Sequence, residues 1–527
     1  MAGLTATPTG GPKAVRASSA GIVFVGLLSG IQSSDPNIAA TALVSASRGL
    51  KMTSGQTSIA ASIFTMMMAA TVISTGLLAD RIGRRKVLMS ALVVAAFGDV
   101  LVALSPHFLT YAVGRGLAGI GLGAVYGASF AYVNALAKQG RLAAALGLFT
   151  AAGALAMVGM SFVGGALAAQ NWRFAFLLVP VVSLIGLALV PRILPMERPL
   201  GQGKPDILGQ LLLGLGVIGV LYGISHAADG LTKPLTLIPL GSGIVLLIGF
   251  FLSQHVRGHA FYPVAIFRNP IFIGALCAGF VYNFGQAASF LQLANIWQYI
   301  GEFGAFQVTL AQLPYLATGI LAALLVGRWM SNGLPTSSTV LLGAVLTAIG
   351  FVSLLLVHRG GSFLTFVPAL ILIGGGTVIA SLPFGSLIIS TAPSAYYGPV
   401  TSSRTTIGQF AYALGIAAAT VSIDKLTLGG TVNRLREAGV PPSQVGTGLD
   451  AVTGYGSTGE SPTTDLGRQA LSAANNSYHV AFHITMVAAG VLCLLVGLIG
   501  FWLLRRVGVP GQPAVSEAGQ PVPIVEP

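Results

Sequence analysis

Residues 76–86 read Gly-Leu-Leu-Ala-Asp-Arg-Ile-Gly-Arg-Arg-Lys and join two apolar segments of the chain. This short link carries one acid and four strong bases, although only 8% of all residues are charged. Lysine and arginine in short loops resist transfer across a membrane, so a link of this kind stays in the cytoplasm. The link therefore predicts a membrane protein and fixes the orientation of the segments on either side of it.

The composition independently indicates a membrane protein. Of the 527 residues, 54% are hydrophobic and 70 are glycine, and the mean hydropathy is +0.83. Several runs exceed the roughly 18 apolar residues that mark a spanning helix. The formal net charge of +13 comes from bases that are scattered through short loops rather than gathered on one face, which speaks against nucleic-acid binding.

Nothing in the sequence indicates an enzyme. We find no nucleotide-binding loop, catalytic triad or cluster of metal ligands, so we expect no cofactor and no metal. The two cysteines, Cys277 and Cys493, lie inside apolar runs without metal-ligand spacing, which indicates neither a disulfide framework nor a zinc site. Because no site for ATP is found, an ion gradient has to drive any uphill transport.

The apolar runs form six, two and six candidate spans, fourteen in all. They lie at about 19–45, 55–79, 87–104, 108–136, 141–169, 171–194, 207–226, 236–256, 270–298, 306–327, 337–357, 364–390, 396–423 and 479–504. No cleavage site follows a short apolar core, so the first run is expected to be a retained helix. We therefore expect an N-terminal half at 19–194, two extra central helices within 195–268 and a C-terminal half at 269–504.

An even number of spans places both termini on one side of the membrane. The loops and tails on the side of the 76–86 link hold more Lys and Arg than the opposite side, so both termini are expected in the cytoplasm. On this topology the 424–476 link, which is longer than any other, lies outside the cytoplasm. The tails at 1–18 and 505–527 are cytoplasmic, and the second is predicted to be disordered.

Four ionisable residues fall well inside the predicted spans: Asp35, Asp99, Arg115 and Arg404. At about 1.5 Å per residue, Asp35 lies near the middle of the membrane, whereas Asp99 and Arg115 lie roughly 8 to 10 Å from its outer face. Asp99 and Arg115 are therefore expected to pair. Their pair is either structural or part of a proton-coupling site.

Asp35 is the strongest candidate for a proton carrier. It is followed by Pro36 inside a predicted helix, which combines a costly charge with a lost backbone hydrogen bond and indicates a cavity. A carboxyl group away from water exchanges protons near neutral pH when no base holds it ionised, and this span contains no base. The alternative is a carboxylate satisfied by the hydroxyl groups of Ser33 or Ser34.

Polar side chains also mark the run at 270–298, which is otherwise apolar. They are Tyr282, Asn283, Gln286, Gln292, Asn295 and Trp297. Polar groups at membrane depth need partners or water, so this helix is expected to line a cavity. We expect Gln32 and Asn37 of the first span, and Arg404 of the thirteenth, to face the same substrate cavity.

The 76–86 link resembles the signature G-x-x-x-D-R-x-G-R-R between helices 2 and 3 of the major facilitator superfamily. The matching residues are Gly76, Asp80, Arg81, Gly83, Arg84 and Arg85. Arg115 and Gly119 similarly resemble the R-x-x-x-G motif of helix 4. The resemblance implies an all-α polytopic fold of two six-helix halves with the substrate site between them. It also implies a gating contact of Asp80 with the start of helix 13 around Tyr396, which steadies the outward-facing state.

The extra central helices, and the W-R-x-x-F pattern at 172–176, resemble the fourteen-helix drug:proton antiporter branch of this family. Helix 5 departs from the antiporter motif of that branch, because Met160 and Ser161 stand in place of its central Gly-Pro. In helix 1, Gln32 occupies the position of the branch's acid, and Asp35 lies three residues later, almost one turn away. The resemblance implies proton-coupled antiport.

These features predict an antiporter of the bacterial inner membrane that exports small amphipathic compounds in exchange for protons, as in multidrug efflux. One alternative keeps the fold but exports a lipid or an endogenous metabolite. An alternative of another class is a membrane receptor or scaffold that transports nothing. The expected partners are the substrate, protons and the lipid bilayer.

Overall fold

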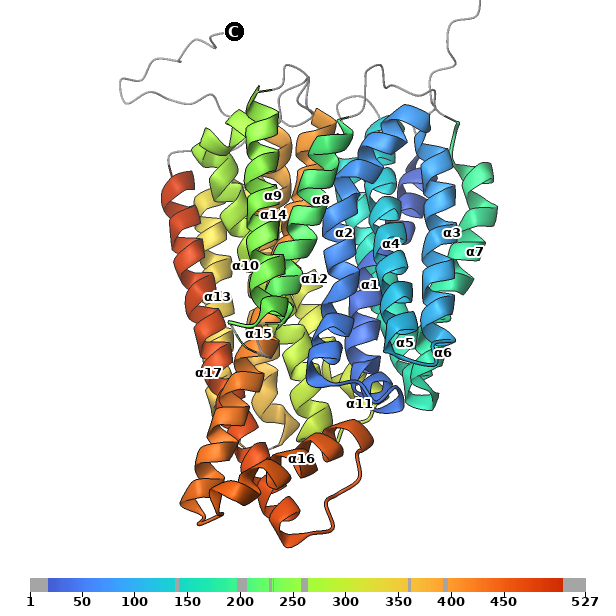
Figure 1. Cartoon of the computed structure of the whole chain (residues 1–527). Helices are drawn as coiled ribbons and strands as arrows, with labels where there is room; N and C mark the ends of the chain where they lie inside the picture. The colour runs from blue at the N-terminus through green and yellow to red at the C-terminus, as the bar shows by residue number, and fades with distance from the viewer. Residues whose placement is uncertain are drawn as a thin grey trace, which may run out of the picture.

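The computed structural model describes residues 18–137, 142–196, 206–226, 230, 232–256, 264–358, 362–391 and 397–505, and every regular element in these ranges is helical. Long helices run side by side through a single bundle (Figure 1). α1 begins and α17 ends at one end of this bundle, whereas the shorter α16 lies at the other end (Figure 1). The tails at 1–17 and 506–527 lie outside the described residues.

In the part that the structure describes, the N-terminal half contains seven helical segments. They are α1 (Ser19–Gly49), α2 (Ser54–Ile82), α3 (Arg84–Ala103), α4 (Phe108–Leu136), α5 (Leu142–Gln170), α6 (Trp172–Ala175) and α7 (Leu178–Ile193). α1 packs along α5, and α4 packs on both α2 and α3. The sixth predicted span is thus divided into a short turn, α6, and the longer α7. A core of buried aliphatic and aromatic side chains joins all of these helices.

The C-terminal half and the central pair complete the bundle. The central pair is α8 (Ile207–Ser225) and α9 (Pro234–Val256). The C-terminal half contains α10 (Pro270–Tyr299), α11 (Ala305–Ala311), α12 (Leu313–Ser331), α13 (Thr336–Ser353), α14 (Val367–Thr391), α15 (Tyr397–Glu437), α16 (Pro442–Thr458) and α17 (Asp465–Leu504). α8 packs on α9 and also contacts α2 and α15, so the central pair covers a junction between the halves.

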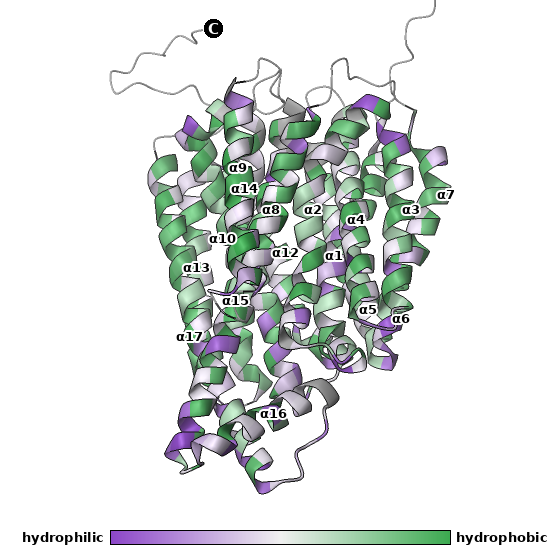
Figure 2. Ribbon diagram, in the orientation of Figure 1, coloured by the Kyte–Doolittle hydropathy of each residue, from purple (hydrophilic) through white to green (hydrophobic). Residues whose placement is uncertain are grey.

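The length and composition of the helices fit a lipid bilayer. Within the described residues, 12 helices are long and apolar enough to cross a membrane. α1 and α2, with 31 and 29 residues, lie among them in the bundle. Apolar residues cover the middle of the bundle, and polar residues gather toward its ends (Figure 2). The chain is therefore a polytopic helical membrane protein with about 12 to 14 spans.

Close helix packing in the N-terminal half depends on glycines of α4. A Cβ atom added to Gly119 would lie 2.3 Å from the backbone oxygen of Phe64 on α2, and one added to Gly121 would lie 2.5 Å from the backbone nitrogen of Ala95 on α3. Side chains at either position would force the helices apart. Small residues at these positions allow the backbones to touch.

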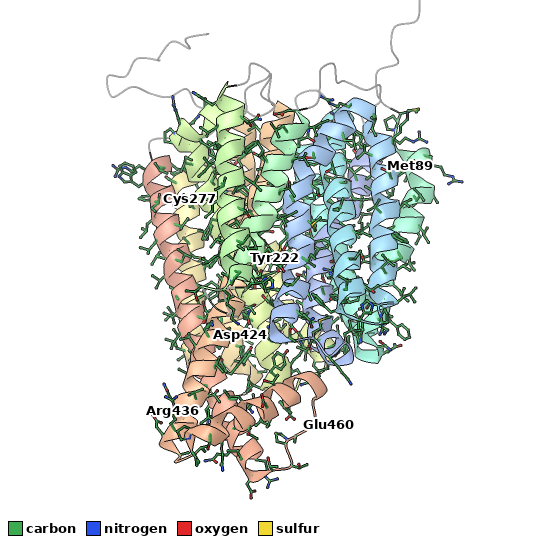
Figure 3. All side chains as sticks on the ribbon, viewed as in Figure 1. Met89, Tyr222, Cys277, Asp424, Arg436 and Glu460 are labelled. Carbon is green, nitrogen blue, oxygen red and sulfur yellow. The ribbon has the colours of Figure 1, made fainter. Side chains whose placement is uncertain are left out.

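The segment 424–476, expected as a long link between spans, is mostly helical. α15 continues to Glu437 and α17 begins at Asp465, so both helices extend beyond the bundle. Along the chain, α16 lies between them. Figure 3 shows Asp424 where α15 leaves the bundle, with Arg436 and Glu460 farther out. We call α16 and the extensions of α15 and α17 the cap. The Arg48 guanidinium of α1 lies 5.9 Å from the centre of the Tyr455 ring of α16, and this contact connects the cap to the N-terminal half.

Candidate functional site

A buried group of three charged side chains joins α1, α3 and α4. One terminal nitrogen of Arg115 lies 2.6 Å from Oδ1 of Asp35 and 3.6 Å from Oδ1 of Asp99. The exposed fraction of each of these side chains is between 0% and 2%. Charges buried at membrane depth are costly unless they are paired, so a constellation of this kind is a candidate functional site. We call these three residues the charge triad.

Aromatic side chains enclose the charge triad. The Arg115 guanidinium lies 4.7 Å from the ring centre of Phe64 and 5.3 Å from that of Phe176. The ring of Tyr111 stands edge-on to Phe176, with 5.9 Å between their centres, and is fully buried. These contacts place the guanidinium against the electron-rich faces of two rings and keep water from the carboxylates.

The charges of the triad do not balance when all three groups are ionised. Two carboxylates face one guanidinium, so the triad then has a net charge of −1, and one bound proton makes it neutral. The carboxyl groups of Asp35 and Asp99 both lie beside the same terminal nitrogen of Arg115. Among the described residues, neither carboxylate oxygen of Asp99 accepts a hydrogen bond from a neighbouring donor. The geometry therefore suits the binding of one proton.

The prediction that no base lies beside Asp35 is wrong. Arg115 does contact Asp99, as predicted, but Asp35 is the nearer acid. Counting residues gives depth along each helix axis, but it misses the offset between neighbouring helices and the reach of an arginine side chain. Asp35 lies near the middle of a 31-residue helix that continues to Gly49, and this level coincides with that of Arg115.

The alternative in which serine hydroxyls satisfy Asp35 is also wrong. Ser34 donates to the backbone oxygen of Ile31 at 2.9 Å, and Ser33 donates to Oε1 of Gln32 at 3.3 Å. Ser34 also lies 3.6 Å from the sulfur of Met160 on α5. Asp35 thus depends on Arg115 alone among the described bases.

α5 holds α1 on both sides of Asp35. Besides the contact of Ser34 with Met160, the Asn37 side-chain amide lies 3.5 Å from the hydroxyl oxygen of Ser161. Met160 and Ser161 occupy the positions at which the sequence departs from the antiporter motif. The departure therefore falls where α5 contacts α1, next to the charge triad.

A central cavity lies between the two halves. Its first part, about 120 Å³, is lined by α1, α4, α5, α10, α14 and α15. Six of the predicted substrate-cavity residues line this part: Gln32, Asn37, Tyr282, Asn283, Gln286 and Arg404. A second part, about 230 Å³, shares six lining residues with the first and extends between α4, α5 and α12. We call the two parts together the central cavity.

Three predicted cavity residues lie elsewhere. Gln292 and Asn295 line a different cavity of about 310 Å³ beneath α16. Asp424 also lines that cavity. Trp297 is 2% exposed and packs 5.5 Å from the ring centre of Phe366, so it belongs to the apolar core. The predictions for these residues were wrong in position because successive turns of α10 pass from the central cavity to the cap.

Several lining residues were missed by the sequence analysis. Tyr126 of α4, Gln409 and Tyr412 of α15, and Met157 of α5 all face the central cavity. Tyr126 and Gln409 interrupt apolar helices, which is the same signal that identified the polar residues of α10. Met157 carries no such signal, because an apolar residue in an apolar helix is not distinctive.

The gating motif forms the junction of α2 and α3. Gly83 separates the two helices and has a φ of 104°, a left-handed conformation that favours glycine. α2 packs along α15, whose described part begins at Tyr397. The predicted contact between the Asp80 side chain and Tyr396 lies outside the described residues and stays a prediction.

Two helical halves around a polar central cavity define a membrane transporter. The family model of the Major Facilitator Superfamily matches residues 22–416, and the chain belongs to this family. The predicted family is therefore confirmed.

Two bacterial relatives extend this comparison. The chain is 29% identical to the "Multidrug resistance protein B homolog" of Mycobacterium tuberculosis over 333 residues, which are 62% of this chain and 62% of that protein. The alignment thus spans less than two thirds of that relative. The "Multidrug efflux pump LfrA" of Mycolicibacterium smegmatis is 23% identical over 453 residues, or 84% of this chain and 88% of that protein.

The fold is also found in a solved structure. The crystal structure of the peptide transporter POT in complex with sulfate has a TM-score of 0.61 and 17% sequence identity, and the match covers 94% of this chain and 97% of that one. This likeness concerns the fold alone. With its apolar helices and bacterial relatives, the chain is a multi-pass protein of the bacterial inner membrane.

Proposed function

We propose that the protein exports small amphipathic compounds in exchange for protons. The observation that carries this proposal is the charge triad, in which two buried acids face one base. A site of this kind is neutral with one proton and has an unbalanced charge without it. The name of the Mycolicibacterium smegmatis relative, a multidrug efflux pump, supports efflux as the direction of transport.

The energetic argument connects protonation with the closure of the site. An unbalanced buried charge is costly, whereas a neutral, hydrogen-bonded group is much less so. The triad is closed off from water, with side-chain exposures of 0–2%, so this conformation favours the protonated form. Loss of the proton favours a conformation in which water reaches the triad. The protein therefore carries a proton through each closed state.

α1 connects the proton site with the substrate site. Asp35 points toward Arg115, while Gln32, Ser33 and Asn37 on the same helix line the central cavity. Pro36 lies inside α1, where it removes one backbone hydrogen bond and gives the helix a point at which it bends. A substrate that shifts α1 therefore also shifts Asp35 relative to Arg115, so that substrate and proton exclude each other.

We further propose that fourteen helices span the membrane and that both termini are cytoplasmic. The helices α1 and α2, added to the 12 apolar candidates, make fourteen. The excess of Lys and Arg on the side of the 76–86 link supports the orientation. On this topology α16 and the cavity beneath it face the outside of the cell.

The test is substrate-dependent proton movement in proteoliposomes that contain a pH-sensitive dye. Under an imposed pH gradient, wild-type protein moves protons when substrate is added, and the Asp99→Asn variant does not. Asp465→Asn is the matched control, because Asp465 also pairs with an arginine, Arg468, but is 98% exposed. Wild-type protein that moves neither protons nor substrate would overturn the proposal in favour of a receptor. Inhibition by lipid but not by drugs would favour lipid export.

A further inference from the structure

The Arg404 side chain is a charged group within the bundle that faces the central cavity from α15. It lines both parts of that cavity. Its guanidinium lies 5.3 Å from the centre of the Phe384 ring. Among the described residues it has no ion-pair partner, and its buried Nε has no hydrogen-bond partner. Arg404 thus differs from Arg115, which faces two acids.

The rest of the central cavity does not compensate this charge. Its lining contains no Asp or Glu and no other Lys or Arg among the described residues. The acids of the charge triad do not line this cavity and face Arg115 instead. The cavity therefore has a local charge of +1, which attracts anions and repels cations.

Space beside Arg404 is kept open by a glycine. A Cβ atom added to Gly385 on α14 would lie 3.4 Å from the central carbon of the Arg404 guanidinium and 3.5 Å from one terminal nitrogen. A Cβ atom at 385 would therefore be in ordinary van der Waals contact with the guanidinium. The guanidinium thus lies beside Gly385 and the Phe384 ring, and Arg404 lines the cavity.

The apolar part of the ligand is indicated by the aromatic wall opposite. Tyr126, Phe130 and Phe149 form one cluster along the second part of the cavity, with ring centres 5.9 to 6.3 Å apart. Rings in this arrangement provide an apolar surface for an aromatic or aliphatic group. The cavity thus offers one cationic anchor and one apolar wall.

We propose that the exported compound is an amphipathic organic anion whose carboxylate or sulfonate is bound by Arg404. This rests on the proposed export function and adds the charge of the substrate to it. A guanidinium presents a planar fork of donors that matches such anionic groups. A cationic compound in this cavity would instead face an unpaired positive charge.

The experiment measures binding to the full-length protein in nanodiscs of neutral lipid. The probes are two fluorescent dyes with one scaffold, anilinonaphthalene sulfonate and the uncharged phenylnaphthylamine. We expect Arg404→Gln to weaken binding of the sulfonate about tenfold to hundredfold, since hydrogen bonds to charged groups are of that strength. Binding of the uncharged dye stays the same.

Two further variants separate charge from structure. Arg404→Lys keeps the charge without the planar fork and retains part of the sulfonate affinity. Arg505→Gln is the matched control, because Arg505 also lies over an aromatic ring, 5.5 Å from the centre of Trp502, but is exposed at the end of α17. It leaves the binding of both dyes unchanged. Size-exclusion profiles confirm that each variant is folded.

Three results would overturn the inference. One is equal loss of both dyes in Arg404→Gln with Arg404→Lys no better, which would make Arg404 a structural residue. Another is tighter binding of a cationic dye than of the sulfonate. The third is loss of wild-type sulfonate binding in phosphatidylglycerol discs, which would give the site to a lipid headgroup. Proton-driven transport is measured separately, so its absence counts against the proposed function and not against the anion site.

Discussion

Replacing Asp35 or Asp99 by asparagine tests what each acid of the charge triad contributes to proton coupling. Either Asp→Asn change leaves one acid facing one base, so the remaining pair is already neutral and has no need of a proton. We therefore expect both Asp35→Asn and Asp99→Asn to lose proton coupling while they still bind substrate. The sequence favoured Asp35 as the proton carrier, but that prediction depended on the absence of a base beside Asp35, and Arg115 lies next to it.

The two variants differ in stability by an amount that follows from the distances to Arg115. At an effective dielectric constant of about 20, unit charges 2.6 Å apart attract each other by about 6.4 kcal/mol, and charges 3.6 Å apart by about 4.6 kcal/mol. Asp35→Asn removes the stronger attraction and Asp99→Asn the weaker one. We expect the free energy of unfolding to fall by about 2 kcal/mol more in Asp35→Asn than in Asp99→Asn.

The assay is reversible unfolding in mixed micelles with increasing denaturing detergent, with Asp465→Asn as the control for loss of an exposed acid. Coupling is measured on the same preparations in proteoliposomes. Equal destabilisation by the two substitutions would mean that Arg115 is shared evenly, and a less stable Asp99→Asn would refute the reasoning. Full coupling in both variants would place the proton site outside the triad.

Three further predictions concern packing and gating. Gly119→Leu should lower the yield of folded protein, because its side chain would meet the Phe64 backbone. Gly147→Leu should not lower it, because nothing lies within 4 Å of a Cβ atom there. The yield of each variant is measured after size exclusion. Trp297→Ala should lower the free energy of unfolding by about 3–5 kcal/mol and leave dye binding in the central cavity unchanged, as measured by detergent unfolding and dye titration. Asp80→Asn should reduce transport rates but not substrate affinity, and an equal loss of both would contradict a gating role.

The family and the division into two halves could be predicted because they depend on local patterns. The 76–86 signature is contained in eleven consecutive residues, and each apolar run is long enough to mark a helix by itself. The family match over 22–416 confirmed the first of these predictions. Polar residues in apolar helices also identified six lining residues of the central cavity, because unsatisfied polar groups are costly at membrane depth.

The partner of Asp35 could not be predicted, because it depends on how the helices are offset. Asp35 and Arg115 come from different helices, and a shift of a few ångströms decides whether they meet. Similarly, α10 carries Gln286 in one cavity, Gln292 in another and Trp297 in the core. Sequence spacing alone does not show where along a helix the neighbouring surface changes.

The two halves of the protein differ in the charges that they hold inside the bundle. In the N-terminal half two buried acids face one base, and in the C-terminal half Arg404 faces the cavity. If a monovalent anion leaves the cell for each proton that enters, two charges move in the direction that an inside-negative membrane potential favours. Each charge contributes about 2.3 kcal/mol per 100 mV, so the pair supplies about 5 kcal/mol, enough for a concentration ratio above about a thousandfold. Exchange of a monovalent cation for a proton moves no net charge and gains nothing from the potential. If Arg404 binds an anion and the acid pair binds a proton, the membrane potential as well as the pH gradient drives export.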